Sequence, residues 1–196
     1  LTATHAKLPM ALTAEKLGEQ FKITRGEADE FALRSQKLSE QGYAKGFIHD
    51  EIAPVEIPSK EGTKTLSKDE HIRPEASIES LTKLKSIFKK DGLVTAGNAS
   101  GMVDGACALV LTTEAFAKEN GSEILGEFLS SSVTGCDPTI MGIGPVPATL
   151  QLLQKTEKQI KDISLFEINE AFACQVLAVN KELKIPLEKL NVDGGA

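Results

Sequence analysis

The feature of this sequence that most limits its fold is an alternation of short apolar runs with helical patterns after Gly92. We expect strands at 107–111, 124–133 and 165–168, and helices at 114–119, 148–156 and 171–183. Strands and helices in this alternating order are typical of layered α/β proteins with parallel strands. The sequence therefore predicts an α/β fold.

The first third of the chain has a different pattern. Thr24 and Glu27 fit a capping box, and apolar residues then recur along one helix face, which predicts a helix that closes at Gly42 and Gly46. Between 47 and 92 this periodicity breaks up around three prolines. We expect a loop-rich region followed by a sheet region, with the change near 97–101.

Composition excludes several classes of protein. The 196 residues carry 22 basic and 28 acidic side chains, a net charge of −6, and 41% are hydrophobic, which is enough for a core. An acidic chain with one Tyr and no Trp lacks the basic surface and the aromatic platforms of nucleic-acid binders. The longest apolar run, 106–111, is far below the roughly 18 residues of a membrane span. We expect neither a nucleic-acid partner nor a membrane span.

The cysteines and histidines do not form a recognisable ligand set. The three cysteines are an odd number without metal-site spacing, namely Cys107, Cys136 and Cys174. The histidines stand singly, at His5, His49 and His71. We expect no metal, no disulfide framework and a reducing compartment, with Cys136 buried rather than reactive.

Three segments are candidates for chemistry. The small residues of 95–105 would let a ligand approach backbone N–H groups, although they could equally form a tight connection before a buried strand. Asn169 follows the expected strand 165–168, at the sheet edge where α/β proteins bind ligands, but it could instead be a helix N-cap with Glu170 at the positive end of the dipole. The glycines and prolines of 135–147 predict a loop of defined shape.

The window from 59 to 90 is locally basic, with eight Lys or Arg against five Asp or Glu. A charge run of this kind is commonly a solvated face. It could also receive an anionic cofactor tail, with Arg73 as a planar phosphate clamp.

Three motifs together resemble the thiolases, which form or cleave 3-ketoacyl-CoA by acyl transfer through an enzyme cysteine. They are TAGNASGMVDG at 95–105, NEAFA at 169–173 and NVDGGA at 191–196, in this order. The resemblance covers essentially the whole chain. Segments 8–11 and 132–148 are most similar to the mitochondrial 3-ketoacyl-CoA branch of fatty-acid β-oxidation, and less similar to the acetoacetyl-CoA branch.

The resemblance implies a layered αβαβα sandwich of two similar halves, with a loop domain in the first half that holds coenzyme A. On this basis 1–102 would be the loop domain, 103–124 the last strand and helix of the first half, and 125–196 the beginning of the second. CoA and acyl-CoA would be substrates, without a further cofactor. The resemblance also implies a mitochondrial location and a homodimer or homotetramer.

The resemblance assigns roles to individual residues. Asn169 would be catalytic, holding a water that helps form an oxyanion hole for the thioester enolate. The adenine end of CoA would lie near Arg73 and the pantetheine near Ser100. The implied CoA contacts are Met10, Arg73, Ser80, Phe88, Ala96, Ser100, Met141, Ala171 and Phe172. Because Pro9 stands where many relatives carry His, no His contact is expected there.

The chain departs from the thiolase pattern in its catalytic set. Its three cysteines match neither the nucleophile nor the acid/base cysteine of the family, and the G-H-P motif has no counterpart. Because the chain begins without Met and ends on Gly194-Gly195-Ala196, we expect a central fragment that is poorly soluble and has no turnover of its own. The alternatives are an acetoacetyl-CoA thiolase and a non-catalytic CoA-binding or assembly module.

Overall fold

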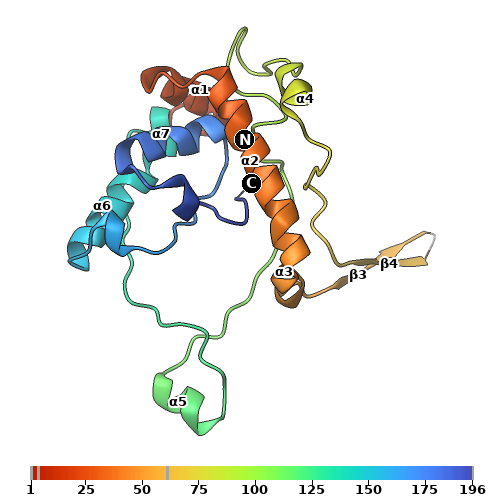
Figure 1. The fold of residues 1–196 in the computed structure, drawn as a ribbon, viewed down its shortest axis with the longest axis vertical. Helices are drawn as coiled ribbons and strands as arrows, with labels where there is room; N and C mark the ends of the chain where they lie inside the picture. Colours follow the sequence, from red (N-terminus) through yellow and green to blue (C-terminus); the bar gives the residue numbers. More distant parts are fainter. Residues whose placement is uncertain (1, 4, 61, 196) are drawn as a thin grey trace.

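The computed structural model describes residues 2, 3, 5–60 and 62–195. Figure 1 shows a helical body from which a hairpin and a long arm project. In chain order the first part contains β1 (Thr2–Ala3), β2 (Leu8–Pro9), α1 (Met10–Gln20), α2 (Arg25–Lys45), α3 (Phe47–Glu51), β3 (Val55–Ser59), β4 (Gly62–Leu66) and α4 (Ile78–Thr82). The second part contains α5 (Glu114–Glu119), the 3-10 helix η1 (Pro138–Ile143), α6 (Pro145–Lys155), η2 (Ile160–Asp162), α7 (Ala173–Leu183) and η3 (Leu187–Lys189).

The expected capping box begins α2. The Thr24 hydroxyl accepts from the Glu27 N–H at 3.2 Å, and the Thr24 N–H donates to the Glu27 carboxylate at 2.6 Å. The helix ends at Gly46, whose φ of 92° is left-handed and therefore suits glycine. Gly42 does not close the helix as predicted. It lies inside the last turns, where its missing side chain leaves room for Ile48 and Asp193.

Helix α7 is the centre of the core. It packs against α1, α2 and α6, and most of its residues are buried. The core includes Val176, Val179 and Leu190, which have no exposed surface. Cys174 lies within it, and burial raises the pKa of its thiol to about 12, so this cysteine is unsuited to act as a nucleophile.

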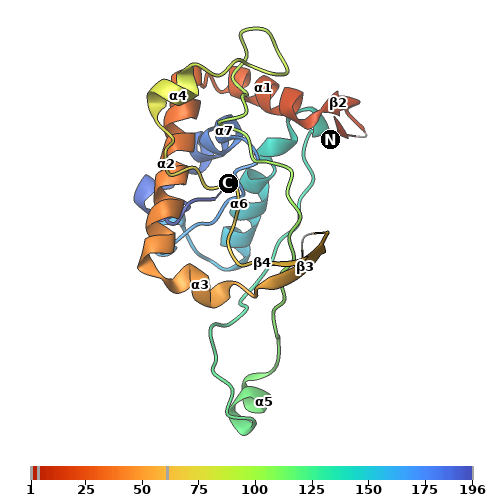
Figure 2. The ribbon, with the colours of Figure 1, turned by 90° about the vertical axis from the view of Figure 1, so that its right-hand side faces the viewer.

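The predicted strands 107–111 and 124–133 do not form. These segments run as two extended limbs of the arm, with α5 at its far end (Figures 1 and 2), and Val110 is 96% exposed. A strand needs a neighbour for its N–H and C=O groups, and the described chain offers these segments none. Exposed apolar side chains on unpaired backbone favour association. Poor solubility stays a prediction.

The third predicted strand, 165–168, is reduced to a single parallel bridge between Phe166 and Leu190. The Phe166 N–H donates to the Lys189 carbonyl at 2.8 Å, and the Asn191 N–H donates to the Phe166 carbonyl at 2.9 Å. The described sheets are only two antiparallel pairs, β1 with β2 and β3 with β4. The parallel sheet expected from the sequence is therefore wrong for these segments as the structure has them.

The three later helices are confirmed. α5 spans 114–119 as expected, α6 begins three residues before the expected start with Pro145 in its first turn, and α7 begins at Ala173. The shaped loop expected at 135–147 folds largely as η1 and the start of α6. Among the residues that the structure describes, no helix combines the length and apolar character that a membrane crossing needs.

Candidate functional site

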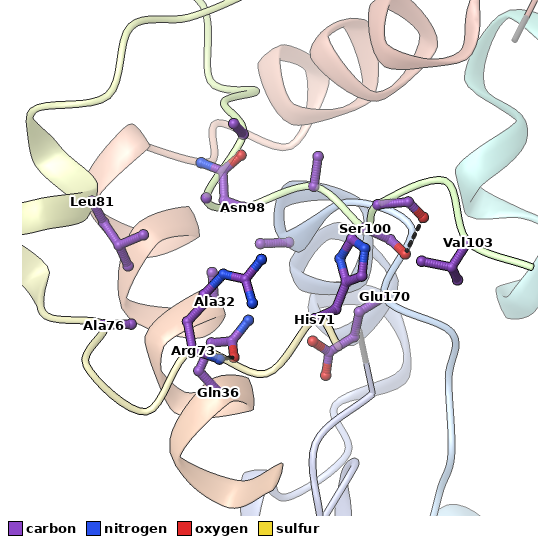
Figure 3. Close-up of a pocket in the computed structure, with 15 residues that line it drawn as sticks. Ala32, Gln36, His71, Arg73, Ala76, Leu81, Asn98, Ser100, Val103 and Glu170 are labelled. Carbon is purple, nitrogen blue, oxygen red and sulfur yellow. Dashed lines mark hydrogen bonds between the residues drawn. The ribbon is translucent and has the colours of Figure 1, made fainter. Parts of the chain in front are cut away.

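A cavity of about 250 Å³ lies beside the start of α7 (Figure 3). Its walls come from α2, the segment 71–76, Leu81 of α4, the glycine-rich loop 96–101 and Glu170. Three of the expected CoA contacts line it, namely Arg73, Ala96 and Ser100. Segments that are far apart in the sequence thus meet around one space.

The glycine-rich loop is held to α2 by a buried polar network. The Asn98 side chain accepts from the Thr95 N–H at 2.8 Å and donates to the Leu93 carbonyl at 2.9 Å. Its amide also donates to the fully buried Asp29 carboxylate at 2.8 Å, and Arg25 pairs with the same carboxylate at 2.7 Å. Because these buried groups satisfy one another, the loop backbone has a fixed position over the cavity.

The loop is joined directly to the segment that precedes α7. Ala99 forms an antiparallel bridge with Phe172. The Ser100 N–H donates to the Ala171 carbonyl at 3.0 Å, and the Ala173 N–H donates to the Asn98 carbonyl at 2.9 Å. The structure therefore places Ala171 beside Ser100 and Phe172 beside Ala99.

Asn169 lies on the exposed turn before this bridge. The N-cap of α7 is Phe172, so the alternative that Asn169 merely caps the helix is wrong. Among the described residues, its side-chain amide has no hydrogen-bond partner. The side chain is therefore free to hold a water or a ligand.

The side chain of Glu170 is 3% exposed and contacts the segment 191–195. The Asn191 amide donates to its Oε1 at 2.7 Å. Burial raises the pKa of this carboxyl, against smaller opposing effects of its hydrogen bonds to Asn191 and Ser35 and of the Arg34 charge. Its role in the structure is thus a buried contact, and not the surface complement of a helix dipole considered from the sequence.

The raised pKa of Glu170 makes stability depend on pH. A carboxyl whose pKa is higher in the folded state favours folding at low pH, and this contribution is lost as pH rises from the ordinary value of about 4.5 through the raised pKa. Glu170→Gln removes this loss. We expect the unfolding free energy of the variant, relative to wild type, to increase with pH across that window. Denaturant titrations of both proteins at several pH values measure it, and a pH-independent difference contradicts it.

Arg73 lies at the cavity with its backbone anchored to α2. Its N–H donates to Gln36 Oε1 at 2.8 Å, and its guanidinium donates to the Glu70 carbonyl at 2.7 Å. Figure 3 shows Arg73, His71 and Glu170 around the same space. Much of the remaining basic window is exposed, as expected for a solvated face.

Six expected contacts lie outside the cavity lining, and four of them are also away from the bridge that Ala171 and Phe172 form. Ser80 belongs to the capping box of α4, where its hydroxyl donates to the Ser77 carbonyl at 2.7 Å. Phe88 is on an exposed loop, while Met10 begins α1 and Met141 lies in η1, which packs against α1. The structure does not gather these four around the space that Arg73 and Ser100 share.

Two polar residues of the cavity, His71 and Gln36, are not singled out by the sequence. The His71 ring lies so close to Gly101 that a Cβ at Gly101 would overlap it. His71 stands alone in the sequence, so no local pattern marks it, and only its position in space places it at the cavity. Cys136 is exposed, so the prediction that it is buried is wrong. No group of three potential metal ligands occurs in the part of the chain that the structure describes.

Comparison with known proteins identifies the family of the chain. The thiolase N-terminal domain family matches residues 1–115, and the thiolase C-terminal domain family matches 122–196. The chain is 48% identical over all 196 residues to human mitochondrial 3-ketoacyl-CoA thiolase, and 47% identical over 188 residues to a probable acetyl-CoA acyltransferase of Staphylococcus epidermidis. These matches cover 100% and 95% of this chain, and 49% and 48% of the relatives.

Solved structures give the same result. The crystal structure of the human mitochondrial enzyme superposes with a TM-score of 0.95 at 48% identity, and that of the Bacillus anthracis acetyl-CoA acetyltransferase with 0.97 at 48%. Each match covers all of this chain and 50% of the other. The fold is therefore a partial thiolase fold, and the chain spans about half the length of the relatives it matches. This chain belongs to the thiolase family.

Proposed function

We propose that the protein to which this chain belongs is a 3-ketoacyl-CoA thiolase. It cleaves the bond between the α and β carbons of a 3-ketoacyl-CoA, transfers the acyl group to the sulfur of CoA, and releases acetyl-CoA and a shortened acyl-CoA. The observation that carries the proposal is the bridge between Ala99 and Phe172, which joins the Arg73 and Ser100 cavity to the turn that presents Asn169. A structure of the human mitochondrial enzyme in complex with CoA, which matches with a TM-score of 0.93, supports it.

In this proposal CoA lies along the cavity. The adenine and phosphate end is near Arg73, whose guanidinium suits phosphate, and the pantetheine follows Ala96 and Ser100. Met10, Ser80, Phe88, Met141, Ala171 and Phe172 are the further contacts that we propose along its path. The domain limits 1–102, 103–124 and 125–196 stay a prediction of the sequence.

Asn169 supplies the oxyanion chemistry. Its neutral amide holds a water whose O–H donates to the thioester oxygen as negative charge develops in the enolate. The nucleophile is assigned to none of Cys107, Cys136 and Cys174, since these match no catalytic cysteine of the family. The chain alone is therefore expected to have no turnover.

The experiment is a thiolysis assay of the complete gene product, with this 196-residue chain as a second sample. We expect CoA-dependent consumption of 3-ketoacyl-CoA by the first and none by the second. Absence of cleavage in the complete product contradicts the proposal, and turnover by the isolated chain contradicts the assignment of its cysteines.

A second candidate substrate is acetoacetyl-CoA, which the close match to the acetyl-CoA acetyltransferase of Bacillus anthracis favours. Assays across acyl chain lengths separate the two. Activity confined to the four-carbon substrate would support the acetyltransferase, and activity on longer chains the β-oxidation enzyme. We further propose a mitochondrial location, following the human relative, and a homodimer or homotetramer.

Arg73→Ala in the complete gene product is expected to raise the KM for CoA more than it lowers kcat. A contact to the distant nucleotide end is made equally in the ground state and the transition state, so it contributes to binding alone. Charge-assisted hydrogen bonds of this kind are worth about 1.5–3 kcal/mol, which corresponds to roughly a ten- to hundredfold change in KM. Steady-state kinetics with varied CoA measure it, with Lys68→Ala of the same basic window as a control. An unchanged KM removes Arg73 from the site.

A further inference from the structure

The turn that carries Asn169 is held from the other side by one buried residue, Asn191. The Ile168 N–H donates to Asn191 Oδ1 at 2.7 Å, and Asn191 Nδ2 donates to the Ile168 carbonyl at 2.8 Å. Both backbone groups of the residue before Asn169 are thereby bound to one side chain.

The residue after Asn169 is bound to the same turn. Asn191 Nδ2 donates its second proton to Glu170 Oε1 at 2.7 Å, and the Glu170 N–H donates to the Gly195 carbonyl at 2.9 Å. A Cβ at Gly195 would overlap Asn191 Nδ2 and lie 2.9 Å from Glu170 Oε1, so only glycine admits this arrangement. The segment 168–170 is therefore fixed on both sides of Asn169.

Asn191 itself is suited to this position. Its φ of 46° is left-handed, a conformation that Asn adopts more readily than most side chains, and it has no exposed surface. All three of its side-chain hydrogen bonds end on Ile168 or Glu170. A fully buried amide whose hydrogen bonds all go to the two neighbours of an exposed residue fixes the backbone on both sides of that residue.

We propose that Asn191 is a positioning residue, which acts through Ile168 and Glu170 to hold in place the backbone that carries the Asn169 amide. This inference rests on the proposed role of Asn169 in the oxyanion hole. An oxyanion donor is effective only when its position is set before charge develops, and a displacement of about 1 Å can cost on the order of a hundredfold in rate.

The test exchanges donor and acceptor across the contact between residues 191 and 170. N191D keeps an oxygen for the Ile168 N–H but places a carboxylate against the Ile168 carbonyl and the Glu170 carboxylate. N191D/E170Q returns a donor to the contact, because the new amide at position 170 can donate to the new carboxylate. Asn180 of α7 gives a matched control. Its Oδ1 accepts from the Ile185 N–H at 2.8 Å, and N180D keeps that acceptor.

In the complete gene product we expect N191D to lower kcat about 10- to 100-fold, with the KM for CoA changed by less than about twofold. N191D/E170Q should recover most of that loss, and N180D should behave as wild type. Hydrogen exchange of the peptide covering 166–171, measured by mass spectrometry, should be faster in N191D and should slow again in the double variant.

Normal kcat in N191D, or no recovery in N191D/E170Q, overturns the inference. A purely structural role would lower the melting temperature without the split between kcat and KM. If N191D fails to fold, the double variant decides, because recovered folding without recovered kcat also overturns the inference. If neither the wild-type protein nor any variant cleaves 3-ketoacyl-CoA in the presence of CoA, the proposed function fails. Unchanged exchange at 166–171 in N191D would separately refute the role of Asn191.

Discussion

Asn169→Asp in the complete gene product is expected to keep its melting temperature and to lose roughly 10² to 10³ in kcat. A carboxylate in place of the neutral amide repels the negative charge that develops on the thioester oxygen. The Asn169 side chain is exposed and makes no hydrogen bond within the described chain, so the fold loses little. Steady-state kinetics and a thermal melt on the same preparations measure the two quantities.

Asn169→Ala is the matched control for this result. If Asn169 capped α7, its loss would cost about 1 kcal/mol of stability. Because the helix begins after Phe172, we expect Asn169→Ala to melt as wild type while kcat falls. An active and thermally normal Asn169→Asp protein contradicts the catalytic assignment.

Leu190→Ala is expected to lower the free energy of unfolding by about 2–5 kcal/mol. Leu190 has no exposed surface and belongs to the core around α7, so its removal leaves a cavity that the rigid backbone cannot close. Leu187, three residues earlier in the same turn, is 47% exposed. Chemical unfolding of both variants in the complete gene product should show that Leu187→Ala costs far less, and equal losses contradict this description of the core.

The helices could be predicted from the sequence because their signals are local. Thr24 and Glu27 mark the start of α2 by their spacing, and the apolar periodicity within a helix needs no distant partner. The strands could not be predicted in this way. The apolar runs at 107–111 and 124–133 carry the composition of buried strands, but a ladder depends on a neighbour that the described chain does not place beside them.

Some residues of the candidate site could be predicted from the sequence and others could not. Asn169 and Ser100 lie in motifs that local spacing and family resemblance single out. The hydrogen bond between Glu170 and Asn191 joins residues about twenty positions apart in the sequence. Gly195 matters because both of these side chains lie close to its backbone. His71 lies at the cavity because the chain after β4 passes beside it, and no local sequence pattern predicts that course. Such contacts follow from tertiary packing alone.

The most direct measurement is a crystal structure of the complete gene product with CoA bound. Our account predicts the phosphates of CoA within hydrogen-bond distance of the Arg73 guanidinium and the pantetheine along Ser100. It also predicts an ordered water between the Asn169 amide and the position of the thioester oxygen. CoA bound away from the cavity between Arg73 and Ser100, or an Asn169 amide directed away from the sulfur of CoA, would contradict the account.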